Sequence, residues 1–350
     1  MPRLDPFSTL AIGSFPFERP AEALDAMGRY LDVPASPQMV RLSPWEDMLL
    51  GAVDGMPFVR ADGEKRIISV PLENRESALA SFYESYYLGD FSFLERRPES
   101  SLGFRPFLER AERDPDFGRG FLKTQVVGPL TFGQSVKVEG AFALVDDPNL
   151  LEAAAYALGA KAAWEAGKIR ALGRFPVVFF DEPGLSGYGS AFSTISEETL
   201  LSALGKSLEA LRSGGDVLAG CHVCGNTDWG LISRAGLDVV NFDAFSYLES
   251  VALYPAELAA FLEKGGYLAW GIVPTSAWDP LISAGDLSER LVRGFKTLEN
   301  RGAPPRLLRS RALLTSSCGL GSLPVEIALA VLKLLSEVKE RLLDSLGGVL

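Results

Sequence analysis

Histidine and cysteine are scarce in this sequence, which has one histidine and three cysteines among 350 residues. Three cysteines are too few for the disulfide framework of a small secreted domain. In a reducing compartment, such cysteines serve as buried thiols, metal ligands or catalytic groups. The histidine and two of the cysteines share the segment Cys221-His222-Val223-Cys224. Most of what the sequence says about function therefore depends on what these side chains bind.

Positive charge is also in short supply. Thirty-four Lys and Arg residues face 45 Asp and Glu residues, for a net charge of -11. The sequence thus has no basic region suited to nucleic acid or an anionic membrane. No apolar run approaches the roughly 20 residues that span a bilayer, and the first residues lack a basic segment followed by an apolar one. We expect a soluble cytoplasmic protein without nucleic-acid or membrane partners.

From residue 121 onward, short apolar runs alternate with amphipathic helices. The runs end in glycine, proline or polar residues and predict strands at 121–127, 176–180, 216–219, 238–242, 267–272 and 312–315. Helices are predicted at 148–171, 197–213 and 256–264, and the first has a capping Asp147 before Pro148. Alternating strands and helices imply a parallel sheet, and continuously apolar strands imply burial on both faces.

The first third of the chain is less regular. It predicts strands at 9–14 and 39–42, and helices at 20–30, 73–88 and 101–112. Residues 57–70 predict a hairpin whose Asp62-Gly63 forms a tight turn with positive φ. With these two strands the count reaches eight. We therefore predict a single (β/α)₈ TIM-barrel domain over 1–350, with the hairpin and extra helices inserted at 44–118, and keep a doubly wound open sheet as the alternative.

Polar residues recur at the carboxyl ends of the predicted strands. In a barrel these ends converge on the face that carries the active site. The residues at these positions are Ser14, Asp181, His222, Cys224, Asp243 and Cys318.

Five of these residues are of the types that bind zinc, and four of the five are predicted to be its ligands. Imidazole, thiolate and carboxylate groups form tetrahedral zinc sites, and two sulfurs favour zinc over magnesium or calcium. The predicted ligands are His222, Cys224, Asp243 and Cys318. Cys221 is out of phase with the inward-facing residues and is interpreted as a packing thiol. Without a second C-x-x-C pair, a catalytic site is preferred to a closed structural one, and the alternative is a core histidine among buried thiols.

A catalytic zinc usually keeps one coordination position open. A thiol that entered this position would lose its proton and become a soft nucleophile at neutral pH. Such a nucleophile suits attack on a transferable methyl group.

Several ordered motifs carry a family resemblance. They resemble those of the carboxy-terminal catalytic barrel of cobalamin-independent methionine synthase, in a superfamily that includes uroporphyrinogen decarboxylase. The segment 222–227 is also similar to zinc-dependent methylcobamide:coenzyme M methyltransferases. The motifs extend over residues 10–325 and are Ile12-Gly13-Ser14-Phe15-Pro16, Asp181-Glu182-Pro183, His222-Val223-Cys224 and Cys318-Gly319.

The resemblance implies roles for individual residues. It assigns zinc to His222, Cys224 and Cys318, and it places Asp243 where the family has a longer glutamate ligand. The segment Ile12-Gly13-Ser14 would hold the carboxylate of an amino-acid substrate.

Asp181 would pair with the ammonium group of that substrate, and Glu46 is the candidate for a second acidic partner. A helix cap at Asp181 and a simple turn at Ser14 are the structural alternatives.

The resemblance also implies a reaction. Full-length synthases have a second barrel that helps to bind folate, whereas 350 residues accommodate one barrel, so the chain resembles shorter, single-barrel relatives. The expected function is zinc-dependent transfer of a methyl group, from methylcobalamin or a corrinoid protein, to homocysteine, which gives methionine. Folate as the donor, coenzyme M as the acceptor, a zinc-free decarboxylase-like lyase and a non-catalytic zinc module that binds a corrinoid protein remain alternatives.

Overall fold

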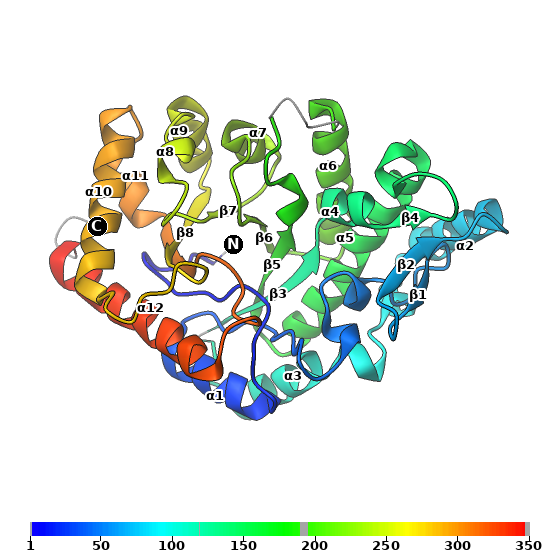
Figure 1. Ribbon diagram of the computed structural model, residues 1–350, viewed down its shortest axis with the longest axis horizontal. Coiled ribbons are helices and arrows are strands. Elements are labelled where there is room, and N and C mark those ends of the chain that lie inside the picture. Colours follow the sequence, from blue (N-terminus) through cyan, green and yellow to red (C-terminus); the bar gives the residue numbers. More distant parts are fainter. Residues whose placement is uncertain (1, 119, 190–194, 347–350) are drawn as a thin grey trace.

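A curled, all-parallel sheet of six strands forms the centre of the protein (Figure 1). The computed structural model describes residues 2–118, 120–189 and 195–346. The strand order is β3-β5-β6-β7-β8-β9, and every neighbouring pair is parallel. The strands are β3 (Phe121–Val127), β5 (Phe175–Asp181), β6 (Leu218–Val223), β7 (Val239–Phe242), β8 (Tyr267–Val273) and β9 (Ala312–Ser316). All six lie at or beside the predicted positions.

Two extended segments, 9–14 and 33–38, lie between the two edge strands β9 and β3. They make only isolated parallel bridges, which are Thr9 to Leu314, Leu10 to Val33, Ser14 to Gln38 and Ala35 to Lys123. Pro34 and Pro37 lack the N–H groups that a regular ladder needs. The structure therefore confirms the α/β class and six strands, but not an eight-stranded barrel. The strand predicted at 39–42 is wrong, because the extended segment ends at Gln38.

Helices connect and cover the strands (Figure 1). Their bounds are α1 (Pro20–Tyr30), α2 (Arg75–Tyr87), α3 (Phe104–Arg113), α4 (Pro129–Ser135), α5 (Pro148–Ala171), α6 (Glu197–Ser213), α7 (Trp229–Arg234), α8 (Leu248–Val251), α9 (Pro255–Glu263), α10 (Ala284–Asn300), α11 (Pro305–Ser310) and α12 (Val325–Leu346). Helices α1, α5 and α6 have the predicted bounds. Asp147 caps α5 as predicted, since its carboxylate accepts from the N–H groups of Asn149 and Leu150. No described helix has the length and apolar character needed to cross a membrane.

The side chains enclosed by the sheet change character along the strands. Near the amino ends they form an apolar cluster, separate from the larger core beneath the helices, that includes Leu10, Val177, Phe179, Leu218, Val239 and Leu313. Side chains two residues apart on a strand point to the same face. On the inward-facing side of the sheet, Phe179 is therefore followed by Asp181 along β5, and Gly220 is followed by His222 along β6. The polar residues lie at the carboxyl ends of the strands, next to the apolar cluster at the amino ends.

The predicted hairpin is present, but its turn differs from the prediction. Strands β1 (Arg60–Asp62) and β2 (Ile67–Val70) are antiparallel, and β2 also pairs with β4 (Lys137–Val138). Because Asp62 pairs with Ile67, the turn contains four residues. The positive φ lies at Arg66, at 52°, and not at Gly63. Gly63 instead packs closely against Trp45, because a Cβ at this position would lie 2.5 Å from the Trp45 ring.

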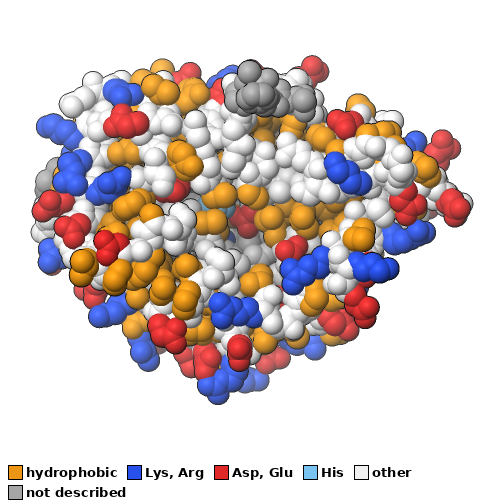
Figure 2. Space-filling view, viewed as in Figure 1, with side chains coloured by type: hydrophobic (Ala, Val, Ile, Leu, Met, Phe, Trp, Pro, Cys, Tyr) orange, Lys and Arg blue, Asp and Glu red, His pale blue; other side chains and the backbone are white. Residues whose placement is uncertain are grey.

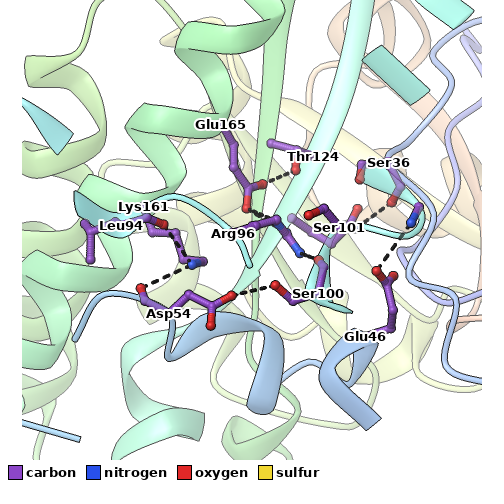
Figure 3. A network of polar contacts seen from close by, with 12 residues as sticks. Ser36, Glu46, Asp54, Leu94, Arg96, Ser100, Ser101, Thr124, Lys161 and Glu165 are labelled. Carbon is purple, nitrogen blue, oxygen red and sulfur yellow. Dashed lines mark hydrogen bonds and ion pairs between the residues drawn. The ribbon is translucent and has the colours of Figure 1, made fainter. Parts of the chain in front are cut away.

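Residues 44–118 are joined to β3 and α5 by a buried network of charges (Figure 3). The Arg96 guanidinium donates to Glu165 Oε1, with its Nε at 2.7 Å and Nη2 at 2.6 Å. The other Glu165 oxygen accepts from the Thr124 hydroxyl. Nearby, Lys161 Nζ donates to the Leu94 carbonyl at 3.1 Å. Both Lys161 and Glu165 are fully buried, so this segment is attached through desolvated polar contacts as well as apolar ones.

Candidate functional site

A cavity of about 320 Å³ opens at the carboxyl ends of the strands. Figure 2 shows it as a hollow near the centre of the visible face, with the pale-blue side chain of the histidine inside. Seven of the nine predicted site residues line it: Ile12, Gly13, Ser14, Asp181, His222, Cys224 and Cys318. Residues from distant parts of the sequence therefore meet in one cavity.

Three potential metal ligands meet in this cavity. One ligand atom from each of His222, Cys224 and Cys318 lies within 4.8 Å of the others. His222 belongs to β6, Cys224 follows that strand directly, and Cys318 lies two residues beyond the end of β9. One imidazole and two thiols are soft ligands of the kind that zinc prefers. The donor set therefore fits a zinc ion.

The two thiols are joined by a hydrogen bond. A hydrogen bond with Cys318, and the neighbouring His222, lower the pKa of the Cys224 thiol. The same bond to Cys224 raises the pKa of Cys318, as does its burial. Cys224 is thus the more acidic thiol of the pair. Cys221 is fully buried in the main core cluster, as expected of a packing thiol.

Asp181 presents a carboxylate to the cavity from the end of β5. Its side chain is buried, and its Oδ1 has no hydrogen-bond partner. Burial raises the pKa of this carboxyl group, while the nearby charge of Lys123 lowers it. An unpaired buried acceptor is costly unless a ligand satisfies it. Asp181 is therefore suited to receive a cationic or donor group of a ligand.

The sequence interpretation missed Lys123, which lies fully buried within the curled sheet. Its Nζ donates to Gln125 Oε1 at 2.9 Å and lies 4.6 Å from the centre of the Phe179 ring. Burial lowers the pKa of Lys123 to about 8. The available signal was a lysine in the middle of the apolar strand Phe121–Val127, because lysines are rarely fully buried without a specific role.

The segment 12–14 is held by backbone contacts on both sides. Gln38 N–H donates to the Gly13 carbonyl at 2.8 Å, and Leu320 N–H donates to the Ser14 carbonyl at 2.9 Å. A Cβ at Gly13 would lie 2.5 Å from Gln38 Oε1 and 2.8 Å from Gln125 Cδ. A side chain at this position would therefore displace Gln38 or Gln125, and Gln125 is a supporting residue that the sequence interpretation did not place.

Two predicted site residues do not line the cavity. The buried Glu46 uses both carboxylate oxygens on backbone N–H groups: Oε2 accepts from Met39 at 2.8 Å, and Oε1 accepts from Leu102 at 2.7 Å. Its sequence neighbours Asp47 and Met48 line the cavity instead. Glu46, labelled in Figure 3, thus holds the backbone beside the cavity, and its contact with a substrate amine stays a prediction.

Asp243 follows β7, as predicted, but it is not part of the three-residue ligand group. Its Oδ1 accepts from the Ser246 N–H at 2.8 Å and so stabilises the turn after the strand. Burial raises the pKa of its carboxyl group. Its coordination of a metal stays a prediction.

Comparison with known proteins points to one group. No protein-family model matches the chain. A methionine synthase from Methanocaldococcus jannaschii is 24% identical over 216 residues, which cover 61% of this chain and 62% of that protein. The solved B12-independent methionine synthase from Shewanella sp. W3-18-1, in complex with selenomethionine, superposes with a TM-score of 0.61. The sequence comparison thus finds a likeness to a methionine synthase, and the structural comparison finds the same fold.

The two matches differ in sequence identity and in the share of each chain that they cover. The solved structure is 14% identical in sequence and matches over 98% of this chain and 100% of its own, so it shows a shared fold. The match with the curated relative spans less than two thirds of that protein's length.

Proposed function

We propose that this protein is a zinc-dependent methyltransferase that methylates the thiol of homocysteine and so forms methionine. One observation carries the proposal: the cavity that brings His222, Cys224 and Cys318 within 4.8 Å of one another also presents the unpaired carboxylate of Asp181. A metal-binding group for a thiol and an acceptor for an amine thus lie in one cavity. The similarity to the two methionine synthases named above supports the proposal.

Zinc is the metal that this donor set favours. His222, Cys224 and Cys318 would hold it, and Asp243 is proposed as a further ligand. The bound ion would supply stabilisation of the substrate thiolate at neutral pH. In the transfer, the substrate sulfur forms a bond to the methyl carbon as the bond from carbon to the donor breaks with its electron pair. The thiol proton is released to solvent.

The chain's own residues would orient the amino-acid part of the substrate. The buried Asp181 carboxylate would accept hydrogen bonds from the ammonium group. The Ile12-Gly13-Ser14 segment would hold the carboxylate through backbone and hydroxyl donors. Holding both groups would position the sulfur and lower the entropic cost of reaching the reactive geometry.

The charge of the cavity favours an amine-bearing thiol over polyanionic substrates. Among the described residues, none that lines the cavity is Lys or Arg. A substrate with many carboxylates, as in a uroporphyrinogen decarboxylase-like lyase, needs such cations to bind. The sulfonate of coenzyme M would likewise have no cationic side chain to pair with. Both remain alternatives to be tested.

We propose a methylated corrinoid, free or protein-bound, as the methyl donor, on the basis of the motif resemblance. A corrinoid is far larger than a cavity of about 320 Å³. The acceptor would therefore occupy the cavity, and the donor would present its methyl group at the mouth. Methylated folate is the alternative donor.

The test combines zinc-loaded protein, methylcobalamin and homocysteine, with demethylation followed by absorbance and methionine by mass spectrometry. Parallel reactions replace homocysteine with coenzyme M, or methylcobalamin with methylated folate. We expect product with methylcobalamin and homocysteine, and at least a 1,000-fold loss in Cys224→Ser and Cys318→Ser, on the order of 4 kcal/mol in the barrier. Cys221→Ala is the matched control and should retain activity. Equal transfer by zinc-free protein would overturn the mechanism.

A further inference from the structure

Asn241, on β7, lies between the candidate ligand His222 and two further strands. It pairs in register with His222 on β6 and with Ala269 on β8. Its side chain is 1% exposed. The Oδ1 atom contacts His222 Nδ1, and Nδ2 lies 2.9 Å from the Ala269 carbonyl oxygen and 2.8 Å from Thr315 Oγ1. All hydrogen-bonding atoms of this amide are therefore engaged by protein groups.

The surroundings dictate which way the amide faces. A backbone carbonyl oxygen can only accept a hydrogen bond. The amide atom next to the Ala269 carbonyl must therefore be the NH₂ group, because the reversed amide would place two acceptors together. Thr315 Oγ1 accepts the second N–H of the same group. The carbonyl oxygen of Asn241 consequently points towards His222.

This orientation determines where the histidine carries its proton. Because Asn241 Oδ1 has no hydrogen to donate, the contact requires a proton on His222 Nδ1. A neutral imidazole has one N–H, so Nε2 keeps the free electron pair that binds metals. With Nδ1 engaged by Asn241, Nε2 is the ring nitrogen left to serve as the ligand atom within 4.8 Å of those of Cys224 and Cys318. The ring is thus locked with its metal-binding nitrogen towards the thiols.

We propose that Asn241 is a positioning residue that fixes the Nδ1–H tautomer of His222 and so prepares Nε2 as a metal ligand. The inference rests on the proposed metal-dependent function, although the tautomer itself exists without metal. Partners on the second nitrogen of a ligating histidine generally set its tautomer and ring orientation. Here the partner is a neutral amide instead of a carboxylate, so it adds no negative charge beneath two thiols and Asp181.

Thr315 extends the same arrangement to the other thiol. It lies on β9, three residues before Cys318, and accepts from Asn241. One amide thus connects the strands that carry His222 and Cys318, across the intervening β7 and β8. Asn241 would hold the ligand-bearing strands in a fixed spatial relation as well as orient the ring.

The single histidine makes the inference directly measurable. Full-length protein labelled with ¹⁵N-histidine gives one pair of ring nitrogen signals, without any need for assignment between residues. Two-bond ¹H–¹⁵N correlation at pH 8 distinguishes a protonated nitrogen from an unprotonated one. We expect Nδ1 to be protonated in the metal-free wild type and Nε2 to be the nitrogen whose signal shifts on zinc addition. A dominant Nε2–H tautomer in the wild type would overturn the inference.

Three variants test how the contacts of Asn241 affect the His222 tautomer and the zinc affinity. Asn241→Leu keeps the volume without the hydrogen bonds, and we expect a mixture of tautomers and zinc affinity lower by about 10- to 100-fold. Asn241→Asp keeps an acceptor for Nδ1 and should retain the Nδ1–H tautomer. Thr315→Val removes one acceptor but leaves the Ala269 carbonyl in place, so the tautomer should be unchanged. Wild-type tautomer and zinc affinity in folded Asn241→Leu would contradict the proposed role.

The two readouts separate this inference from the proposed function. Zinc affinity is measured by competition with a chelating dye, and Cys224→Ser provides the reference for a lost ligand. If the wild type bound no zinc, the proposed function would fail, while the metal-free spectra would still test what Asn241 does. If the wild type bound zinc and Asn241→Leu matched it in both readouts, only the positioning role would fail.

Discussion

The protein contains two buried polar regions that differ in how completely their charges are paired. Between residues 44–118 and α5, Arg96 binds Glu165, and Lys161 donates to a backbone carbonyl. No atom of these three side chains is among the buried unpaired ones found in the described part of the chain. In the cavity, by contrast, Asp181 Oδ1 is buried without a partner.

The contrast indicates that the first region attaches residues 44–118 to the sheet, whereas the second binds a ligand. Buried polar groups in folded proteins are nearly always hydrogen-bonded, so an exception calls for an explanation. The paired region holds an irregular segment against the sheet, and its groups are satisfied within the protein. The cavity leaves an acceptor for a ligand to satisfy. Removing a charge should therefore destabilise the fold in the first region and weaken ligand binding in the second.

The largest expected effect is on stability in the attachment region. Glu165→Ala leaves the Arg96 guanidinium buried without its partner, and loss of one member of a buried ion pair costs about 3–5 kcal/mol. Urea unfolding should show this decrease in the free energy of unfolding. The exposed Glu84→Ala on α2 serves as the control and should change stability by less than about 0.5 kcal/mol. A loss for Glu165→Ala no larger than the control's would show that the pair does not anchor the segment.

The second effect concerns pH. Burial, and then the nearby charge of Arg96, lower the pKa of Lys161 from 10.5 to about 8. Between these values the unfolded chain binds the proton and the native protein does not, so stability increases as pH rises from about 8 to 10.5.

The contribution of this lysine is on the order of 3 kcal/mol, from the free energy of a pKa unit. Urea unfolding at pH 8 and 10.5 should give a smaller increase for Lys161→Met than for the wild type. Lys123 titrates in the same range in both proteins, so only the difference between them is diagnostic. Identical increases would mean that Lys161 keeps an ordinary pKa.

The smallest effect is expected in the cavity. Asp181→Asn should raise KM for homocysteine about 10- to 100-fold, because a hydrogen bond to a charged group is worth about 1.5–3 kcal/mol. Stability should not fall, and a modest increase is expected, since the carboxylate is desolvated without compensation. A homocysteine analogue without the amino group is the control and should bind both proteins alike. An unchanged KM for homocysteine would remove Asp181 from the amine-binding role.

The accuracy of the sequence interpretation follows the regularity of the chain. Helices α1, α5 and α6 have their predicted bounds because apolar periodicity in α1 and α6, and end signals such as Asp147 before Pro148 in α5, act locally. The strand predicted at 39–42 is wrong because three of its four residues are apolar but none makes a sheet contact, while the bridges fall on 33–38. The pairing of that segment with β3 depends on closure of the curled sheet, which is not a local property.

Glu46 illustrates a similar limit at the level of single residues. The chemistry of a carboxylate suits both a substrate amine and backbone N–H groups. Only the fold decides between them, and it places Leu102 and Met39 around Glu46 while the next residue, Asp47, lines the cavity.

The sequence by itself determined the alternation of strands and helices and the residue types at the strand ends, because periodicity and side-chain chemistry are local properties. It also identified His222, Cys224 and Cys318 as a set, since parallel strands bring their carboxyl ends to one edge. Only the tertiary structure decided which nitrogen of His222 faces the thiols and which buried carboxylate lacks a partner. Those outcomes depend on Asn241, Ala269 and Thr315, whose contacts with the site arise from the order of the strands in the sheet.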